Sequence, residues 1–167
     1  MSPTGRPTGS GRSAQHEGPP ATAGDIQPAD GDWLTLGRTV LAAQPFSQWM
    51  GARLVHLAPG EAELHLPLRP MHLQQGGMAH GGVLGYAADN ALTFAGGTRL
   101  GADVVTAEYK ICLLRPAIGR ALVARATALH VGRSQAVCRC DLFIVDDRGE
   151  ALLCATALGT IVRAGGP

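Results

Sequence analysis

Charge is scarce in this sequence, and lysine is almost absent from it. Asp, Glu, Lys and Arg make up only 16% of the 167 residues, and the formal net charge is +1. This balance predicts no electrostatic attraction to nucleic acid or to an anionic membrane. Arginine is used almost throughout, with Lys110 as the one lysine. Arginine suits phosphate binding through its planar, forked side chain, although codon preference explains the bias more simply.

Long apolar runs are also missing. No run approaches the ~18 residues that a membrane span needs, and the first residues lack the apolar core of a secretion signal. We therefore expect a cytoplasmic protein with no membrane partner. Four cysteines occur, all in apolar, strand-like stretches: Cys112, Cys138, Cys140 and Cys154. Their spacing does not match that of usual zinc sites, so we expect buried, reduced thiols.

Several catalytic motifs are absent as well. The chain has no Gly-x-Ser-x-Gly elbow, and its glycine-rich stretch lacks the Gly-Lys-Ser/Thr ending of a phosphate-binding loop. His72 and His80 have no third ligand at the spacing of a metal site. Serine-elbow, phosphate-loop and metal chemistry therefore fit this sequence poorly.

The order of the expected elements indicates one α+β domain after a tail. Residues 1–30 are dominated by Gly, Pro, Ser, Thr and Ala, so we expect a disordered tail, followed by one domain over 31–167. Its expected elements are a helix over 32–43 with Asp32 as N-cap, a hairpin of strands 52–57 and 61–68, a helix over 82–97, and strands over 104–114, 121–131, 134–145 and 151–162. Short connections between strands predict antiparallel neighbours, so a helix packed on a six-stranded antiparallel sheet is the expected fold.

The helix expected over 82–97 has two unlike faces. At ~100° per residue, one half carries apolar side chains that would pack on the sheet: Val83, Leu84, Ala87, Ala88, Ala91, Leu92, Phe94 and Ala95. The other half carries Gly85, Tyr86, Asp89, Asn90, Thr93, Gly96 and Gly97 instead of the charged residues of a solvated face. Glycine weakens a helix, so we interpret this half as a contact face for a ligand or a second subunit. Asp89 is the only acid between Glu63 and Asp103.

His80, Gly81 and Gly82 stand at the entrance of that helix. Glycines let the backbone N–H groups of a helix N-terminus approach a ligand, and the positive end of the helix dipole stabilises a negative oxygen. These are the physical requirements of an oxyanion hole. Taken alone, His80 is more readily explained as a helix cap or a packed core histidine.

Asp89 follows His80 by nine positions, and further short motifs surround this pair. They are Gln74 before the histidine, then Val105–Glu108, Leu114–Ala117 and Val131–Arg133 in the strand region. This constellation resembles the hot-dog-fold acyl-CoA thioesterases, in particular the PaaI-like branch, over about residues 46–162. The resemblance implies one hot-dog domain, a long central helix wrapped by a six-stranded antiparallel sheet. It also implies hydrolysis of a small aromatic or medium-chain acyl-CoA to free acid and CoA.

The resemblance further implies roles for single residues. Asp89 would be the general base or nucleophile, and the Gly81 amide would polarise the thioester carbonyl. Gln74 would contact that carbonyl or the attacking water, His80 would shape the loop, and Thr106 would help hold the water. Substrate-binding positions would be Gly82, Gly132, Arg133 and Ser134, although Gly132-Arg133 is equally well explained as a hairpin turn. No cofactor or metal is implied, because CoA enters only as part of the substrate.

The resemblance implies self-association as a dimer or a dimer of dimers, with each site formed at the interface of two subunits. A non-catalytic acyl-CoA-binding module is the alternative, although a pure binder has no need for an acid at Asp89. A hot-dog hydratase would need a different spacing of histidine and acid. Several apolar residues could line an acyl pocket, although core packing would explain most of them: Phe46, Trp49, Met50, Met71, Met78 and Tyr86.

Overall fold

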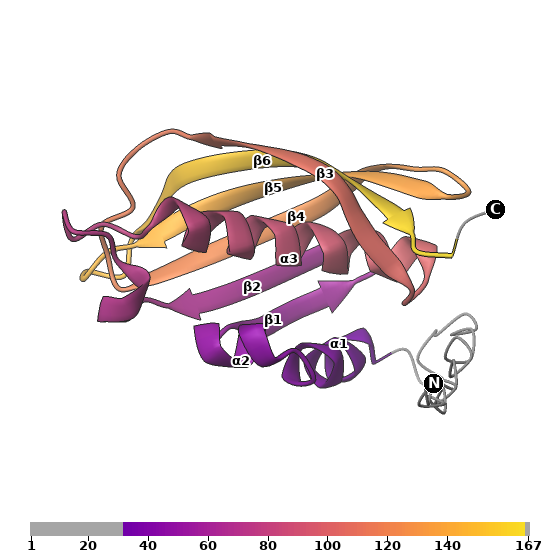
Figure 1. The fold of residues 1–167 in the computed structure, drawn as a ribbon, viewed down its shortest axis with the longest axis horizontal. Helices are drawn as coiled ribbons and strands as arrows, with labels where there is room; N and C mark the ends of the chain where they lie inside the picture. Colours follow the sequence, from indigo (N-terminus) through magenta and orange to yellow (C-terminus); the bar gives the residue numbers. More distant parts are fainter. Residues whose placement is uncertain (1–31, 166–167) are drawn as a thin grey trace, which may run out of the picture.

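The computed structural model describes residues 32–165 of the chain, and Figure 1 shows how its elements are arranged. In chain order they are α1 (Trp33–Ala42), α2 (Pro45–Met50), β1 (Arg53–Ala58), β2 (Glu61–Pro67), the 3-10 helix η1 (Pro70–His72), α3 (Gly81–Leu100), β3 (Val104–Leu113), β4 (Ala121–Val131), β5 (Gln135–Val145) and β6 (Ala151–Arg163). Both expected helices and all six expected strands are present, and α2 and η1 are additional to them. The tail expected over 1–30 lies outside the described residues.

The six strands form one antiparallel sheet in the order β1-β2-β4-β5-β6-β3. Strands β4, β5 and β6 pair with their neighbours along the chain, as their short connections predict. The same prediction for β3 and β4 is wrong, because β3 pairs with β6 and forms an edge of the sheet. Residues 114–120 cross the end of the sheet instead. Their buried Ala117 accepts a hydrogen bond from the Ala79 N–H at 2.9 Å, which ties this crossing to the loop before α3.

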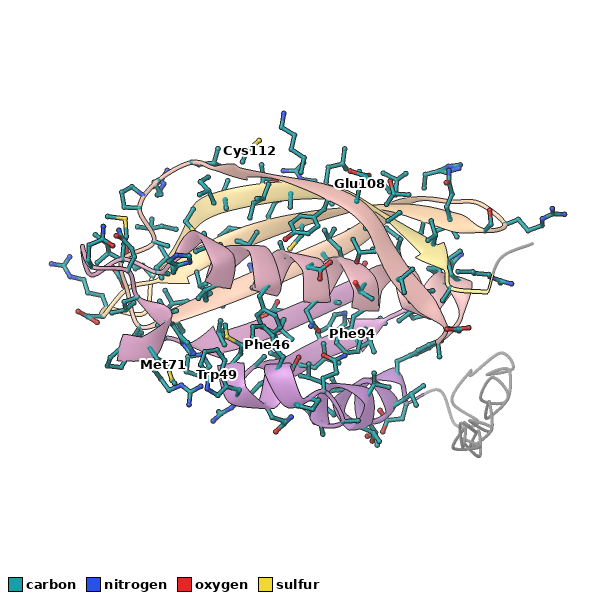
Figure 2. The ribbon with its side chains drawn as sticks, in the orientation of Figure 1. Phe46, Trp49, Met71, Phe94, Glu108 and Cys112 are labelled. Atoms are coloured by element: carbon teal, nitrogen blue, oxygen red, sulfur yellow. The ribbon has the colours of Figure 1, made fainter. Side chains whose placement is uncertain are left out.

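The sheet curves around α3, which is the central helix of the fold (Figure 1). Its apolar half is buried in the core as expected, except that Phe94 is only half-buried and extends toward α1 (Figure 2). The helix runs from Gly81 to Leu100, a few residues beyond the expected bounds. The predicted α+β architecture, a long helix wrapped by a six-stranded antiparallel sheet, is therefore confirmed.

The interpretation of the helix glycines as a contact face for a ligand or a second subunit is wrong for Gly85 and Gly96. Both are buried against the chain's own sheet. A Cβ atom at Gly96 would lie 2.8 Å from the Cβ of Ile161 in β6, and one at Gly85 would lie 3.1 Å from the Tyr109 hydroxyl in β3. Because these positions lack a side chain, β3 and β6 can pack closely against α3, and the sheet curves around the helix.

At the N-terminal side, α1 and α2 cover the sheet edge formed by β1. Asp32 caps α1 as expected, since its side chain accepts a hydrogen bond from the Thr35 N–H at 3.0 Å. The sequence Gln44-Pro45-Phe46 ends this helix but also starts α2, because proline is tolerated at the first position of a helix. Gly51, with φ 73°, then terminates α2 in the left-handed conformation.

The cysteines are all free, and three of the four are buried. Burial raises the pKa of the Cys138 thiol to about 11 and that of the Cys140 thiol to about 12, so both stay protonated and unreactive. The prediction of a buried thiol is wrong for Cys112, which is exposed. It projects from the outer face of the edge strand β3 (Figure 2).

Candidate active site

Asp89 lies near the middle of α3 and lines a cavity between α3, α1 and the start of β3. Its Oδ1 atom is buried and has no hydrogen-bond partner among residues 32–165. Leaving a buried polar atom unpaired costs about 1–3 kcal/mol, and more for a charged group. Such an atom indicates a place where a water, a substrate or a second subunit supplies the missing donor.

Two threonine hydroxyls connect the helix to β3 beside this acid. Thr93 Oγ1 donates to the Asp89 backbone carbonyl at 2.8 Å and lies 2.9 Å from Thr106 Oγ1. A hydroxyl has one hydrogen, so the Thr106 hydroxyl must be the donor to Thr93. Thr106 can then act toward a bound water only as an acceptor. Thr93 was not assigned a role from sequence, although its position four residues after Asp89 places it on the same helix face.

The cavity beside Asp89 has a volume of about 510 Å³. Gln44 and Asn90 also line it, and the Asn90 side-chain amide donates to Gln44 Oε1 at 3.3 Å. The same Gln44 oxygen accepts from Ser47 Oγ at 2.6 Å. This small network fixes the turn between α1 and α2 next to the acid. Sequence reasoning missed Gln44, since its contact with Asn90 spans 46 positions.

His80 is the N-cap of α3. Its Nδ1 accepts a hydrogen bond from the Gly82 N–H at 3.0 Å, so the interpretation of His80 as a helix cap is confirmed. In the neutral ring the hydrogen is therefore on Nε2, which can donate to a ligand. The His80 side chain is exposed and lines two of the cavities.

Gly81 begins α3, so its N–H has no acceptor within the helix. Residues 32–165 supply no other acceptor for it, and the exposed position of Gly81 leaves it accessible. Gln74, which was expected to contact the substrate, is half-buried in the preceding loop. Its side-chain oxygen accepts from the Gly76 N–H at 3.3 Å, and its backbone N–H donates to the Met78 carbonyl at 2.9 Å. Gln74 therefore also holds this loop in shape.

The expected catalytic residues separate into two groups within one chain. Gln74, His80 and Gly81 line a cavity of about 530 Å³ at the start of α3, whereas Asp89 and Thr106 line the cavity of about 510 Å³ farther along. Gly81 and Asp89 are eight residues apart on one helix, which corresponds to about 12 Å. One thioester group is too small to contact both within the same chain.

The expected substrate-binding turn lies away from both cavities. Gly132, Arg133 and Ser134 connect β4 to β5 at the end of the sheet opposite the loop that contains His80 (Figure 1). The Gly132 N–H donates to the Gln135 carbonyl at 2.8 Å, so the interpretation of a hairpin turn is confirmed. Arg133 and Ser134 are exposed, which leaves the arginine available to a ligand or to another chain.

A third cavity, of about 300 Å³, lies between α2, η1 and the start of α3. Four of the six candidates for an acyl pocket line it: Phe46, Trp49, Met50 and Met71. Figure 2 shows Trp49 and Met71 close together beside α2. His72, to which the sequence analysis gave no role, also lines this cavity and is 1% exposed. Its Nδ1 accepts from the Arg69 N–H at 3.2 Å, and its carbonyl accepts from the His80 N–H at 2.9 Å.

Two further findings concern metals and membranes. Within residues 32–165, no three His, Cys, Asp or Glu side chains gather in a way that could hold a metal ion. None of the helices described is both long enough and apolar enough to cross a membrane.

Known proteins share both the sequence and the geometry of this region. A family model of the thioesterase superfamily matches residues 76–151, from the loop before His80 to the start of β6. A provisionally named esterase of Deinococcus radiodurans is 34% identical over 122 residues, which cover 72% of this chain and 80% of that protein. This chain belongs to the thioesterase superfamily. The resemblance to hot-dog thioesterases seen in the sequence is thereby confirmed.

Two solved structures are similar to this thioesterase-superfamily chain. A thioesterase family protein from Silicibacter pomeroyi is 30% identical, with a TM-score of 0.75, and the match covers 80% of this chain and 99% of that one. A variant of PaaI, a phenylacetic acid degradation protein of Thermus thermophilus, is 34% identical, with a TM-score of 0.62 and coverage of 72% and 99%. Membership of the superfamily supports thioester hydrolysis as the activity. The family model leaves α1, α2, β1, β2, η1 and all of β6 after its first residue outside its match.

Proposed function

We propose that this chain is an acyl-CoA thioesterase, which hydrolyses the thioester to a free acid and CoA. The observation that carries the proposal is the buried, unpartnered Oδ1 of Asp89, which has no donor among residues 32–165 and lies at the edge of a cavity of about 510 Å³. A carboxylate in that position can accept a proton from water or attack a carbonyl carbon. Superfamily membership supports the thioester chemistry, and the choice of an acyl-CoA is the proposed refinement.

The threonine pair supports a route through water. A water between Asp89 and Thr106 would donate one hydrogen to each, because Thr106 already donates its own hydrogen to Thr93. The water oxygen then bonds to the carbonyl carbon and its proton passes to Asp89. When the carbon–sulfur bond breaks, that proton goes to the CoA sulfur. Direct attack by Asp89, followed by hydrolysis of the resulting anhydride, is the other route open to the same carboxylate.

The carbonyl oxygen would be stabilised by the start of α3 of a second copy of the chain. The Gly81 N–H and the positive end of a 20-residue helix would point at that oxygen, and His80 Nε2 would adjoin it. We infer two chains because about 12 Å separates Gly81 from Asp89 along one helix. In a dimer with two-fold symmetry, each site would combine Asp89 and Thr106 of one copy with the loop at Gln74, His80 and Gly81 of the other.

The edge strand β3 supports self-association. It is ten residues long, and within residues 32–165 no strand pairs with its outer side. Val105 is 49% exposed and Leu113 is 59% exposed, which is unusual for an edge that faces only solvent. Thr106, at the start of this strand, would then lie close to the dimer interface. Association of two such dimers into a dimer of dimers is a separate prediction.

The CoA phosphates would be bound by arginine. Arg133, in the turn with Gly132 and Ser134, is exposed and suits a phosphate through its planar side chain. Because this turn lies far from the cavities of its own chain, in a dimer it would bind the phosphates of a CoA in the active site of the other copy. Arg115, which lines the cavity at Gln74 and Gly81, is a second candidate. CoA enters as part of the substrate, and the expectation that no cofactor is needed stays a prediction.

The test is a panel of acyl-CoAs, from acetyl to decanoyl and phenylacetyl, assayed by release of free thiol. The wild type should hydrolyse at least one of them, and Asp89→Asn should lower kcat by about a thousandfold or more while the circular dichroism spectrum stays unchanged. An Asp89→Asn variant with wild-type turnover would remove the catalytic assignment. Acyl-CoA binding without turnover in the wild type would favour the non-catalytic module.

A further inference from the structure

The lining of the cavity beside Asp89 divides into polar and apolar side chains. The polar ones include Asp89, Thr93 and Thr106, together with Gln44, Asn90 and Thr98. The large apolar ones come from four elements: Trp33, Leu36, Val40, Leu57, Phe94 and Val104. Its volume of about 510 Å³ lies within the range of about 300–1,000 Å³ that small-molecule sites occupy. A ligand with one reactive polar group and an apolar remainder matches this division.

One wall of the cavity is α1, and α1 is packed closely on the sheet. A Cβ atom at Gly37 would lie 2.5 Å from both Leu54 Cδ2 and Leu57 Cδ2, so only glycine permits this approach. The Arg38 side chain also donates to the Leu54 carbonyl at 3.0 Å. The wall is therefore fixed relative to the acid, and it belongs to the part of the chain outside the family-model match. Membership of the superfamily alone does not specify this wall.

The cavity is elongated along α3. Its lining on that helix extends from Asp89 to Thr98, nine residues that correspond to about 13 Å. A phenylacetyl group is too short to extend along this whole path from a thioester at Asp89. A straight, flexible acyl chain of medium length can follow it beside the apolar side chains of α1, Leu57 and Phe94.

The cavity at α2 is the competing place for the acyl group. It adjoins His80 and Gly82 and is lined by Phe46 and Trp49, but its volume is only about 300 Å³ and no acid of residues 32–165 lines it. Phe46 is 57% exposed and Trp49 is 52% exposed, so this cavity encloses a ligand less completely. Size and closeness to Asp89 both favour the cavity at α1.

We propose that the acyl group lies in the cavity between α1, α3 and β3, and that Val40 of α1 sets the length of the chain accepted, with medium-length straight chains preferred. This inference rests on the proposed acyl-CoA thioesterase function. Val40 is suited to the role because it lines the cavity and is 43% exposed, so a larger side chain can be introduced there without repacking the core.

The experiment compares the ratio of kcat/KM for decanoyl-CoA to that for acetyl-CoA in four proteins: wild type, Val40→Phe, Thr39→Phe and Trp49→Ala. Thr39→Phe is the matched control, since Thr39 is exposed on the same helix and lines none of the cavities described. The wild-type ratio should exceed one, and Val40→Phe should lower it at least about tenfold, as expected when apolar contacts are lost from a specificity pocket. Thr39→Phe and Trp49→Ala should keep the wild-type ratio.

Three results would overturn the inference. They are an unchanged ratio in Val40→Phe, a collapse of the ratio in Trp49→Ala, or a wild type that prefers phenylacetyl-CoA to decanoyl-CoA. In each of these cases the wild type still hydrolyses acyl-CoA, so the proposed function stands. A wild type that hydrolyses no member of the panel would remove the proposed function and this inference together. Thermal unfolding of each variant separates a change in the cavity from a loss of fold.

Discussion

Asp89 and Gly81 are expected to act through different kinds of atom. Asp89 would act through a carboxylate oxygen that is buried without a partner in residues 32–165. Gly81 would act through its backbone N–H at the first position of α3. A side chain can be replaced directly, whereas a backbone N–H is removed only by proline. The position of Gly81 permits that replacement, because proline is favoured at the first residue of a helix.

Gly81→Pro should therefore remove the proposed carbonyl donor and leave the fold intact. The preceding residue, His80, has φ −63° and ψ 139°, a conformation that a following proline accepts. We expect kcat for acyl-CoA hydrolysis to fall about a hundredfold or more, the effect of losing one oxyanion donor. Gly81→Ala keeps the N–H, and its Cβ would lie 3.8 Å from Leu113 at ordinary contact distance, so it is the matched control. Equal activity of the two variants would rule out the N–H as a donor.

Single residues differed in how well the sequence predicted them. Asp89 could be singled out because no other acid lies between Glu63 and Asp103. Of the residues near it, Thr106 was named only through the family resemblance and Gln44 was missed. Both are brought to α3 by contacts between distant parts of the chain, Thr106 with Thr93 and Gln44 with Asn90. His80 was predicted as a cap because capping is a local interaction. Burial of Cys112 was predicted wrongly, since nothing in a strand pattern tells which strand is at an edge.

Helix α3 shows how an element can be predicted while its surroundings are not. Its apolar periodicity places it in the core, and that prediction is confirmed. The strand order is set by contacts between distant parts of the chain. Val105 of β3 pairs with Val162 of β6, which no local pattern encodes. The glycines of α3 were therefore attributed to a ligand or a second subunit, whereas β3 and β6 of the same chain explain two of them, Gly85 and Gly96.

Gly96 provides a test of this close packing. Gly96→Ala would place a Cβ 2.8 Å from the Ile161 Cβ, a rigid part of β6, so we expect a loss of about 1–3 kcal/mol in the free energy of unfolding. Gly97→Ala is the control on the same helix. Its Cβ would lie 3.3 Å from a Val104 methyl group, and alanine's better helix propensity, worth about 1 kcal/mol, should offset that contact. Urea unfolding measures both, and equal stability of the two variants would show that Gly96 is not required for the close packing of α3 on β6.

The free energy of unfolding of the whole protein should depend on pH through His72. Burial, and then the charge of Arg69, hold the pKa of His72 below its ordinary value of 6.5. The folded state thus disfavours the protonated ring, and the unfolded state binds more protons as pH falls below about 6.5. The contribution of His72 to stability is therefore complete above that pH and is lost as pH falls below it.

Thermal unfolding at about pH 7.5 and about pH 5.5 tests this sign. The unfolding temperature of the wild type should be lower at the more acidic pH than at the higher one. In His72→Asn this decrease should be smaller, because the amide oxygen can still accept a hydrogen bond from the Arg69 N–H but cannot titrate. Glu63 does not interfere. Burial raises the pKa of the Glu63 carboxyl, but hydrogen bonds from His65 and Arg125 outweigh burial and lower that pKa from 4.5. Glu63 therefore changes the stability only at more acidic pH than that of this test. Equal decreases in the two proteins would exclude His72 as the cause.

If each active site is formed by two copies of the chain, Asp89→Asn and Gly81→Pro, each inactive alone, should restore activity when they are co-expressed. A mixed dimer contains one site with both intact groups and one with neither. Because random pairing makes about half of the dimers mixed, hydrolysis should reach about one quarter of the wild-type rate per chain. Co-expressed dimers with no more activity than the single variants would contradict the two-chain site.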